Sequence, residues 1–195
     1  MLFSYKVSFS QTKIDLGELP NIDSVSCAFQ THRPDKDIVP IRESKNSLEI
    51  RVHVTTGFSP PYILIISFDK INWLLVKATP SYDSLSKTIG DTLKNIPQNI
   101  LEQNFDSLKK NKIFSLPDFY CLNLKGSVDD GIWGCIEIKA GDFYRQYDYN
   151  NPCSYLEMNK DVAELKYLCN VIDLFEKMIY SDNPPKVRKG KQKHT

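Results

Sequence analysis

The sequence is poor in the features that mark the commonest special classes of protein. Its 195 residues include only 8 glycines and 3 histidines, too few for a collagen-like repeat or a histidine-rich metal site. The five cysteines are odd in number and include no Cys-x-x-Cys pair, which argues against a disulfide framework and a zinc site. The longest apolar stretch, residues 62–76, is interrupted by Asp69 and Lys70 and is shorter than the roughly 18 apolar residues of a membrane helix.

These absences point to a cytoplasmic protein without a membrane partner. Polar and apolar residues alternate from Met1 to Phe9, whereas a signal peptide needs a continuous apolar stretch. We therefore expect the five cysteines to be reduced and mostly buried as small apolar side chains. Because no glycine-rich loop precedes a helical segment, we expect no cofactor. His53 is expected to be a solvated side chain on the polar face of a strand.

The charge is distributed unevenly along the chain. The formal net charge is +1, from 25 Lys and Arg against 24 Asp and Glu. The C-terminal end holds five basic residues and no acid: Lys186, Arg188, Lys189, Lys191 and Lys193. The rest of the chain has 20 basic and 24 acidic residues, a net charge of −4. We expect residues 184–195 to be a disordered basic tail that could bind nucleic acid weakly, and residues 1–183 to form one domain, with a candidate subdivision near residue 80.

Strand patterns dominate the first 80 residues. Residues 48–54 alternate apolar and polar side chains, as in a half-buried strand. Residues 62–66 are apolar on both faces, as in a central strand, and Asp69-Lys70 is a candidate hairpin turn into residues 71–76. Two weaker strand patterns occur near residues 2–9 and 22–30.

Helical patterns occupy two later regions. Apolar residues recur every three or four positions over residues 82–108, with Pro97 in between. This spacing predicts a helical hairpin or one kinked helix over about 81–110. The same spacing over residues 162–179 predicts a long C-terminal helix at about 160–180.

Strand patterns return between these two helical regions. Residues 119–124, 132–139 and 143–149 are predicted strands, and Ala140-Gly141 is the predicted two-residue turn between the last two. Strands and helices are thus segregated along the chain. The expected fold class is α+β, with a largely antiparallel sheet, a central helical hairpin and a long C-terminal helix.

One constellation has the spacing of a catalytic motif. Pro117-Asp118, eighteen intervening residues and then Glu137-Ile138-Lys139 match the PD-(D/E)xK pattern and resemble restriction-enzyme-like nucleases. The resemblance implies that Asp118 and Glu137 hold Mg²⁺ and that Lys139 stabilises charge at phosphorus. A hairpin of residues 119–124 with 132–139 would place Asp118 opposite Lys139. In that family, however, the motif lies on the second and third strands after the first helix, and here it falls on the first and second.

A second resemblance covers about residues 116–180. The segment from Asp130 to Glu137, followed by Gly141, Tyr144, Tyr149 and Pro152, is similar to a hairpin in uncharacterised bacterial proteins. Their shared pattern is Asp-Gly, an aromatic residue, Ile-Glu, then Gly, Tyr and Pro before a C-terminal helix. The resemblance implies a small bacterial cytoplasmic protein, and it assigns no activity to any residue.

The same hairpin presents a candidate partner-binding surface. Pairing across Ala140-Gly141 would place Glu137 opposite Tyr144 and Trp133 opposite Asp148. Because strand side chains alternate, these four residues would share one face and the other face would be apolar core. A mixed aromatic and acidic face is compatible with protein binding, so Trp133, Glu137, Tyr144 and Asp148 are the predicted partner-binding residues.

These patterns favour a non-enzymatic protein-binding or regulatory protein. The most concrete version is a bacterial immunity protein that neutralises a toxin, because an acidic body suits a basic partner through steering and charge complementarity. No metal is expected under this hypothesis. The alternative is a metal-dependent nuclease that uses Mg²⁺ and is built on Asp118, Glu137 and Lys139.

Overall fold

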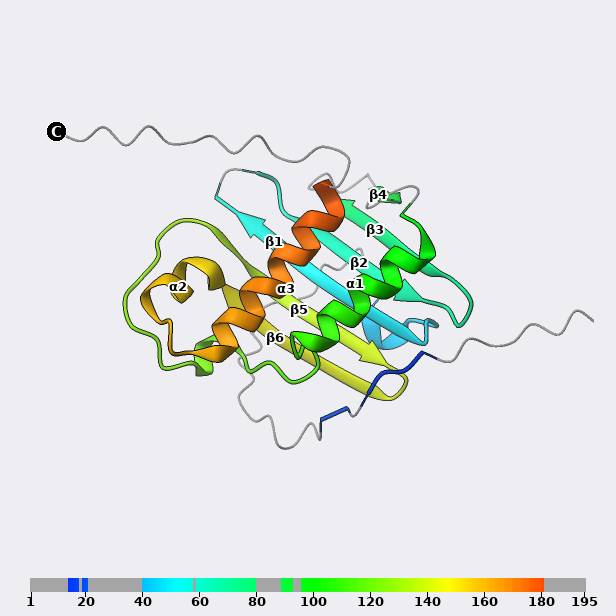
Figure 1. Ribbon diagram of the computed structural model, residues 1–195. Helices are drawn as coiled ribbons and strands as arrows, with labels where there is room; N and C mark the ends of the chain where they lie inside the picture. Colours follow the sequence, from blue (N-terminus) through cyan, green and yellow to red (C-terminus); the bar gives the residue numbers. More distant parts are fainter. Residues whose placement is uncertain are drawn as a thin grey trace, which may run out of the picture.

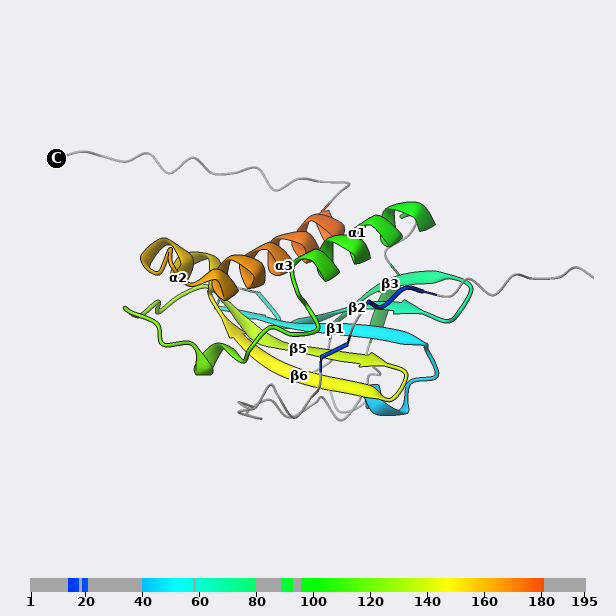
Figure 2. The same cartoon turned by 60° about the horizontal axis from the view of Figure 1, so that its bottom comes forward.

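A six-stranded antiparallel sheet with three helices on one side forms the fold (Figures 1 and 2). The computed structural model describes residues 14–17, 19–20, 40–57, 59–79, 89–92 and 96–180. The strand order in the sheet is β4-β3-β2-β1-β5-β6. The expected α+β class, with a largely antiparallel sheet and a C-terminal helix, is confirmed.

The elements follow one another along the chain as strands, a helix, a hairpin and two helices. The strands are β1 Leu48–Thr56, β2 Tyr62–Phe68, β3 Trp73–Thr79, β4 Ile89–Thr92, β5 Ile132–Ala140 and β6 Phe143–Asn150. The helices are α1 Gln98–Lys110, α2 Pro152–Met158 and α3 Ala163–Tyr180, with short 3-10 turns η2 Ile41–Glu43 and η3 Phe119–Cys121. Because β1 lies between β2 and β5, strands from both sides of residue 80 belong to one sheet. None of the helices in the described ranges combines the length and apolar character that crossing a bilayer requires.

The core lies between the sheet and the helices α1 and α3. Alternation along β1 directs Leu48, Ile50 and Val52 toward the helices, and all three are buried. The apolar residues of α3 that set its predicted helical spacing are buried against this face: Leu165, Leu168, Val171, Ile172 and Phe175. The expected C-terminal helix therefore forms because one broad side of it is covered by the sheet.

A continuous series of aromatic rings connects α1 to the sheet. Phe68 and Trp73 lie 5.1 Å apart between ring centroids, and Trp73 and Phe105 of α1 lie 5.0 Å apart. Phe114 then lies 6.2 Å from Phe105 and 6.0 Å from Phe143 of β6. Tilted and edge-to-face pairs of this kind add about 0.5–1.5 kcal/mol each beyond area burial. The rings thus link β2, β3, α1 and β6 into one core.

The first half of the predicted helical hairpin is wrong where the structure describes it. Residues Ile89–Thr92 form strand β4, which pairs antiparallel with β3. Gly90 and Thr92 are poor helix formers, and β3 offers backbone partners that local spacing cannot reveal. The second half of the prediction is confirmed as α1, which begins directly after Pro97.

The predicted strand 119–124 is also wrong. The chain forms the 3-10 turn η3 at Phe119–Cys121, because Asp118 caps it by accepting a hydrogen bond from the Tyr120 backbone N–H at 2.9 Å. A side chain that captures a nearby backbone N–H gives the chain an alternative to strand pairing.

The β5–β6 turn lies one residue later than predicted. Ala140 pairs with Phe143, so Gly141 and Asp142 form the two-residue turn. Gly141 has a φ of 59°, in the left-handed region that the first position of such a turn requires and that glycine adopts without strain.

This change shifts the register of the hairpin but not its faces. Glu137 pairs with Gln146 and Trp133 with Asn150, each two residues further along β6 than expected. Because side chains alternate with a period of two, a shift of two residues leaves every side chain on its predicted face.

The expectation of five reduced cysteines is wrong. Cys153 and Cys169 form a disulfide across a separation of 16 residues, and Cys121 is also disulfide-bonded. Cys135 is a free thiol and is buried. Sequence analysis missed the Cys153–Cys169 pair because the two residues are 16 positions apart, and only the packing of helix α2 beside α3 brings them together.

Three sequence predictions lie outside the described residues. They are the weak strands near 2–9 and 22–30 and the basic tail of residues 184–195.

The close approach of β1 and β5 depends on Gly134. A Cβ atom at this position would lie 1.8 Å from the carbonyl oxygen of His53. We expect Gly134→Ala to lower the free energy of unfolding by more than about 3 kcal/mol, because β1 and β5 would have to separate. Urea denaturation of the purified variant measures this change.

Gly57→Ala is the matched control. A Cβ atom at Gly57 has no heavy atom within 4 Å, so its effect should stay within about 0.5 kcal/mol. Equal stability of the Gly134 and Gly57 variants would contradict the described packing of β1 against β5.

Candidate functional site

Polar side chains gather on the sheet face opposite the three helices. Alternation directs Glu49, Arg51 and His53 of β1 to this face, together with Glu137 of β5 and Tyr144 of β6. We call these five residues the polar cluster. The four residues other than Tyr144 are no more than 5% exposed. Ionisable groups are rarely buried without partners, so each of these four should have one.

Glu137 is the centre of the polar cluster. Its Oε2 accepts a hydrogen bond from His53 Nε2 at 2.7 Å, and its Oε1 accepts one from the Tyr144 hydroxyl at 3.3 Å. Burial alone would raise the pKa of Glu137, but the hydrogen bond and charge of His53, with Arg51 and Tyr144, hold it below its ordinary value. The carboxylate therefore stays ionised inside the protein.

Glu49 forms the second half of the polar cluster. Its Oε1 accepts hydrogen bonds from Arg51 Nε at 2.7 Å and from Arg51 Nη2 at 2.6 Å. Its Oε2 accepts from Ser44 Oγ at 2.5 Å and from Asn46 Nδ2 at 2.7 Å. Four donors thus compensate the loss of water around this carboxylate.

Tyr144 connects the polar cluster to the molecular surface. Burial and the charge of Glu137 raise the pKa of its hydroxyl to about 12, so the group stays protonated and donates. The guanidinium carbon of Arg42 lies 4.0 Å from the centroid of the Tyr144 ring, a cation–π contact. The interaction chain therefore runs from His53 through Glu137 and Tyr144 to Arg42.

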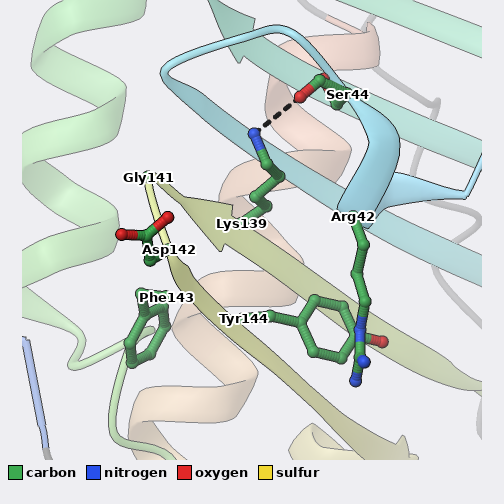
Figure 3. Close-up of a pocket in the computed structure, with 7 residues that line it drawn as sticks. All are labelled: Arg42, Ser44, Lys139, Gly141, Asp142, Phe143 and Tyr144. Atoms are coloured by element: carbon green, nitrogen blue, oxygen red, sulfur yellow. Dashed lines mark hydrogen bonds between the residues drawn. The ribbon is translucent and has the colours of Figure 1, made fainter.

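Beside Tyr144 a pocket of about 680 Å³ opens between η2 and the β5–β6 turn (Figure 3). It is lined by Arg42, Ser44, Lys139, Gly141, Asp142, Phe143 and Tyr144. Lys139 reaches away from the sheet and donates hydrogen bonds to the carbonyl oxygens of Ser44 at 2.7 Å and Asn46 at 3.1 Å. The pocket thus holds a lysine and an arginine.

Asp118 lies at the outer edge of β6 and is only 1% exposed. Its Oδ1 accepts from the Tyr120 N–H, and its Oδ2 accepts from the Asp148 N–H at 3.0 Å. Burial raises the pKa of Asp118, and these two N–H groups oppose that shift only in part. Asp118 therefore has a structural role: its carboxylate connects η3 to β6 at the edge of the sheet.

The structure brings together only part of the nuclease-like set. Glu137 and Lys139 share a face of β5, and each is engaged in its own hydrogen bonds. Lys139 pairs with Glu49 and Tyr144 in the sheet, so the hairpin that would have placed Asp118 opposite Lys139 does not form.

Potential metal ligands converge at one position in the described part of the chain. Cys153, Cys169 and Asp173 have ligand atoms within 4.8 Å of one another. The two sulfurs are bonded to each other, so they are not thiolate ligands.

The four predicted partner-binding residues differ in exposure. Trp133 is 40% exposed and Tyr144 is half-buried, whereas Glu137 and Asp148 are 5% exposed. Trp133 can therefore contact a partner directly, whereas Glu137 and Asp148 are buried.

Sequence reasoning missed His53, Arg51, Glu49 and Arg42. Alternating charged residues in β1 were interpreted as a solvated face, and the expectation that His53 is solvated is wrong, since it is 5% exposed. The available signal was the apolar segment 62–66, which marks β2 as a central strand. Its neighbour β1 is then itself inside the sheet.

Comparison with known proteins assigns no family to the chain. No protein-family model matches it, and no curated protein shows significant sequence similarity to it. The resemblance of residues 116–180 to bacterial hairpin proteins stays a prediction.

Replacing Glu137 by Gln should lower the free energy of unfolding at neutral pH by about 1–3 kcal/mol, because buried His53 and Arg51 lose the charge they face. The folded-state pKa of Glu137 lies below its ordinary value of 4.5. The stabilisation by its charge is therefore present above about pH 4.5 and lost as the pH falls through the folded-state pKa. Urea denaturation at a series of pH values should show the difference between wild type and variant shrinking in acid.

Glu157→Gln serves as the control, because Glu157 lies on α2 and is exposed. Its stability should follow that of the wild type within about 0.5 kcal/mol. A Glu137 variant with the same small effect would show that the polar cluster does not stabilise the fold.

Proposed function

We propose that the chain is a non-enzymatic protein that binds and neutralises or regulates a protein partner, as a bacterial immunity protein does. The observation that carries the proposal is an exposed group of aromatic and acidic residues around the start of β5. Trp133 is 40% exposed, Tyr120 is 57% exposed, and both Asp129 and Asp130 are exposed directly before β5. We call these four residues the acidic–aromatic surface.

Asp148 connects the two aromatic residues of this surface. Trp133 pairs with Asn150, so Asp148 lies diagonally beside it on the same face of the hairpin. Tyr120 lies near the same carboxylates: burial and the charges of Asp148 and Asp118 raise the pKa of its hydroxyl. Trp and Tyr are the residues that most often dominate the energy of protein interfaces.

The charge of the chain indicates the chemistry of the partner. Outside the terminal basic segment the net charge is −4, and Asp129 and Asp130 add exposed negative charge at the acidic–aromatic surface. A cationic protein partner is complementary to this surface and is steered toward it.

Trp133→Ala should weaken the complex with such a partner by about thirtyfold or more, as expected for an aromatic hot spot. The protein encoded by the neighbouring gene is the partner to test, by co-purification and calorimetric titration. Asp129→Asn with Asp130→Asn should slow association and reduce its salt dependence.

Ile71→Ala is the matched control, because Ile71 is 66% exposed but lies in the β2–β3 turn, away from β5. It should bind as the wild type does. Unchanged binding by Trp133→Ala, or Mg²⁺-dependent cleavage of DNA or RNA that Glu137→Gln abolishes, would contradict the proposal.

The compartment decides which partners the protein can meet. Disulfides persist in oxidising compartments, such as the bacterial periplasm, and are rare in the cytoplasm. The Cys153–Cys169 bond and the disulfide at Cys121 therefore favour an oxidising compartment over the cytoplasm that the sequence predicted.

Cys153 and Cys169 should be protected from iodoacetamide in acid-quenched cells and should react only after a reductant is added, because their sulfurs are bonded to each other. Mass spectrometry of the isolated protein measures both states. Modification of both residues without reductant would instead support the cytoplasmic location.

A further inference from the structure

Two cysteines and an aspartate come together where α2 packs against α3 (Figure 1). One ligand atom from each of Cys153, Cys169 and Asp173 lies within 4.8 Å of the other two. Cys153 Sγ itself lies 3.7 Å from Asp173 Oδ1. Both cysteines are half-buried, so solvent and small ions reach them. We call these three residues the α2–α3 triad.

The positions of the triad follow from the two helices that carry it. Cys169 and Asp173 are four residues apart in α3, and side chains at this spacing share one face of a helix. It is also the spacing by which a single helix supplies two ligands to one zinc ion. Cys153 is the second residue of α2 and meets this face of α3 from the neighbouring helix. The triad therefore surrounds one point between the two helices.

The oxidation state of the two sulfurs decides whether the triad can hold a metal. In the disulfide the sulfurs are bonded to each other and offer no thiolate. A thiol reductant changes this state: two thiol molecules supply two electrons and two protons, become a disulfide themselves, and leave Cys153 and Cys169 as free thiols. A divalent ion that binds the two sulfurs displaces their protons to water. The disulfide and the metal ion are therefore alternatives, because each uses the same two sulfur atoms.

From this geometry we infer that the reduced protein binds Zn²⁺ through Cys153, Cys169 and Asp173. Zn²⁺ accepts thiolate and carboxylate ligands in a four-coordinate arrangement, and three protein ligands leave the fourth position to water. Mg²⁺ prefers oxygen ligands and an octahedral geometry, so the triad does not suit it. The ion joins α2 to α3 in the reduced protein, as the disulfide does in the oxidised one. This inference does not depend on the proposed protein partner.

Co²⁺ is a suitable probe, because thiolate ligands give it a charge-transfer absorption in the near ultraviolet that oxygen ligands do not give. The full chain is reduced with a water-soluble phosphine, which is converted to its oxide, and is titrated with Co²⁺ in the absence of air. The absorption should saturate at one equivalent, with a dissociation constant on the order of 10 μM. Zn²⁺ should displace Co²⁺ because it binds such sites more tightly, and excess Mg²⁺ should not. The unreduced chain should give no such absorption.

Variants of the triad test each ligand in the reduced chain. Cys153→Ser should weaken Co²⁺ binding by about a hundredfold or more, and Asp173→Asn by about tenfold or more. Asp161→Asn removes the same charge from an exposed residue outside the triad and should change the affinity by less than about twofold. Reduction also releases Cys121 from its disulfide, so Cys121→Ser is the control for the other thiols and should bind as the wild type does.

Thermal melting followed by circular dichroism gives a second readout. Zn²⁺ should raise the melting temperature of the reduced wild type, because a ligand that binds only the folded state stabilises it. It should raise that of Cys153→Ser little or not at all. Absence of the Co²⁺ absorption in the reduced wild type, equal affinity of the Cys153 or Asp173 variant, or loss of the absorption in folded Cys121→Ser would overturn the inference.

Discussion

A charged side chain that leaves water must meet a partner, and this requirement organises the face of the sheet opposite the helices. An unpaired buried ion costs several kcal/mol, yet β1 carries Glu49, Arg51 and His53 at a position inside the sheet. Arg51 turns back to Glu49, and His53 requires Glu137 from β5. A slip of one residue between β1 and β5 would move Glu137 into the apolar core. The ion pairs and the apolar alternation therefore specify the same register.

The same interactions connect the middle of the sheet to its surface. Glu137 holds the Tyr144 hydroxyl, and the Tyr144 ring carries Arg42. Lys139 lies two residues beyond Glu137 on the same face of β5 and lines the pocket at the end of the hairpin. Trp133 stands exposed near the beginning of β5. The β5–β6 hairpin thus has a pocket with two basic residues at its turn and an acidic, aromatic surface near its open end, and Glu137 of the buried polar cluster lies between them along β5.

Sequence patterns correctly predicted the strands and helices in which the spacing of apolar residues matches the side that is buried. The predictions lie close to the observed positions of β1, β2, β5, β6, α1 and α3. In these elements, burial of one or two faces requires apolar residues at a regular spacing, which the sequence shows. Predictions failed where local and long-range interactions compete. Residues 89–92 have the apolar spacing of a helix but form a strand, because they pair with the edge of β3. Residues 119–121 have a strand pattern but form a 3-10 turn, because Asp118 caps it.

The sequence by itself determined which side chains share a face, because alternation along a strand is a local property of the backbone. For this reason Trp133, Glu137 and Tyr144 were correctly placed on one face even though the hairpin register was wrong by two residues. Only the tertiary structure decided that Glu137 is buried on this face and that it meets His53, 84 positions away. It also decided that Cys153 meets Cys169. These contacts depend on the order in which strands and helices assemble, and no local spacing encodes that order.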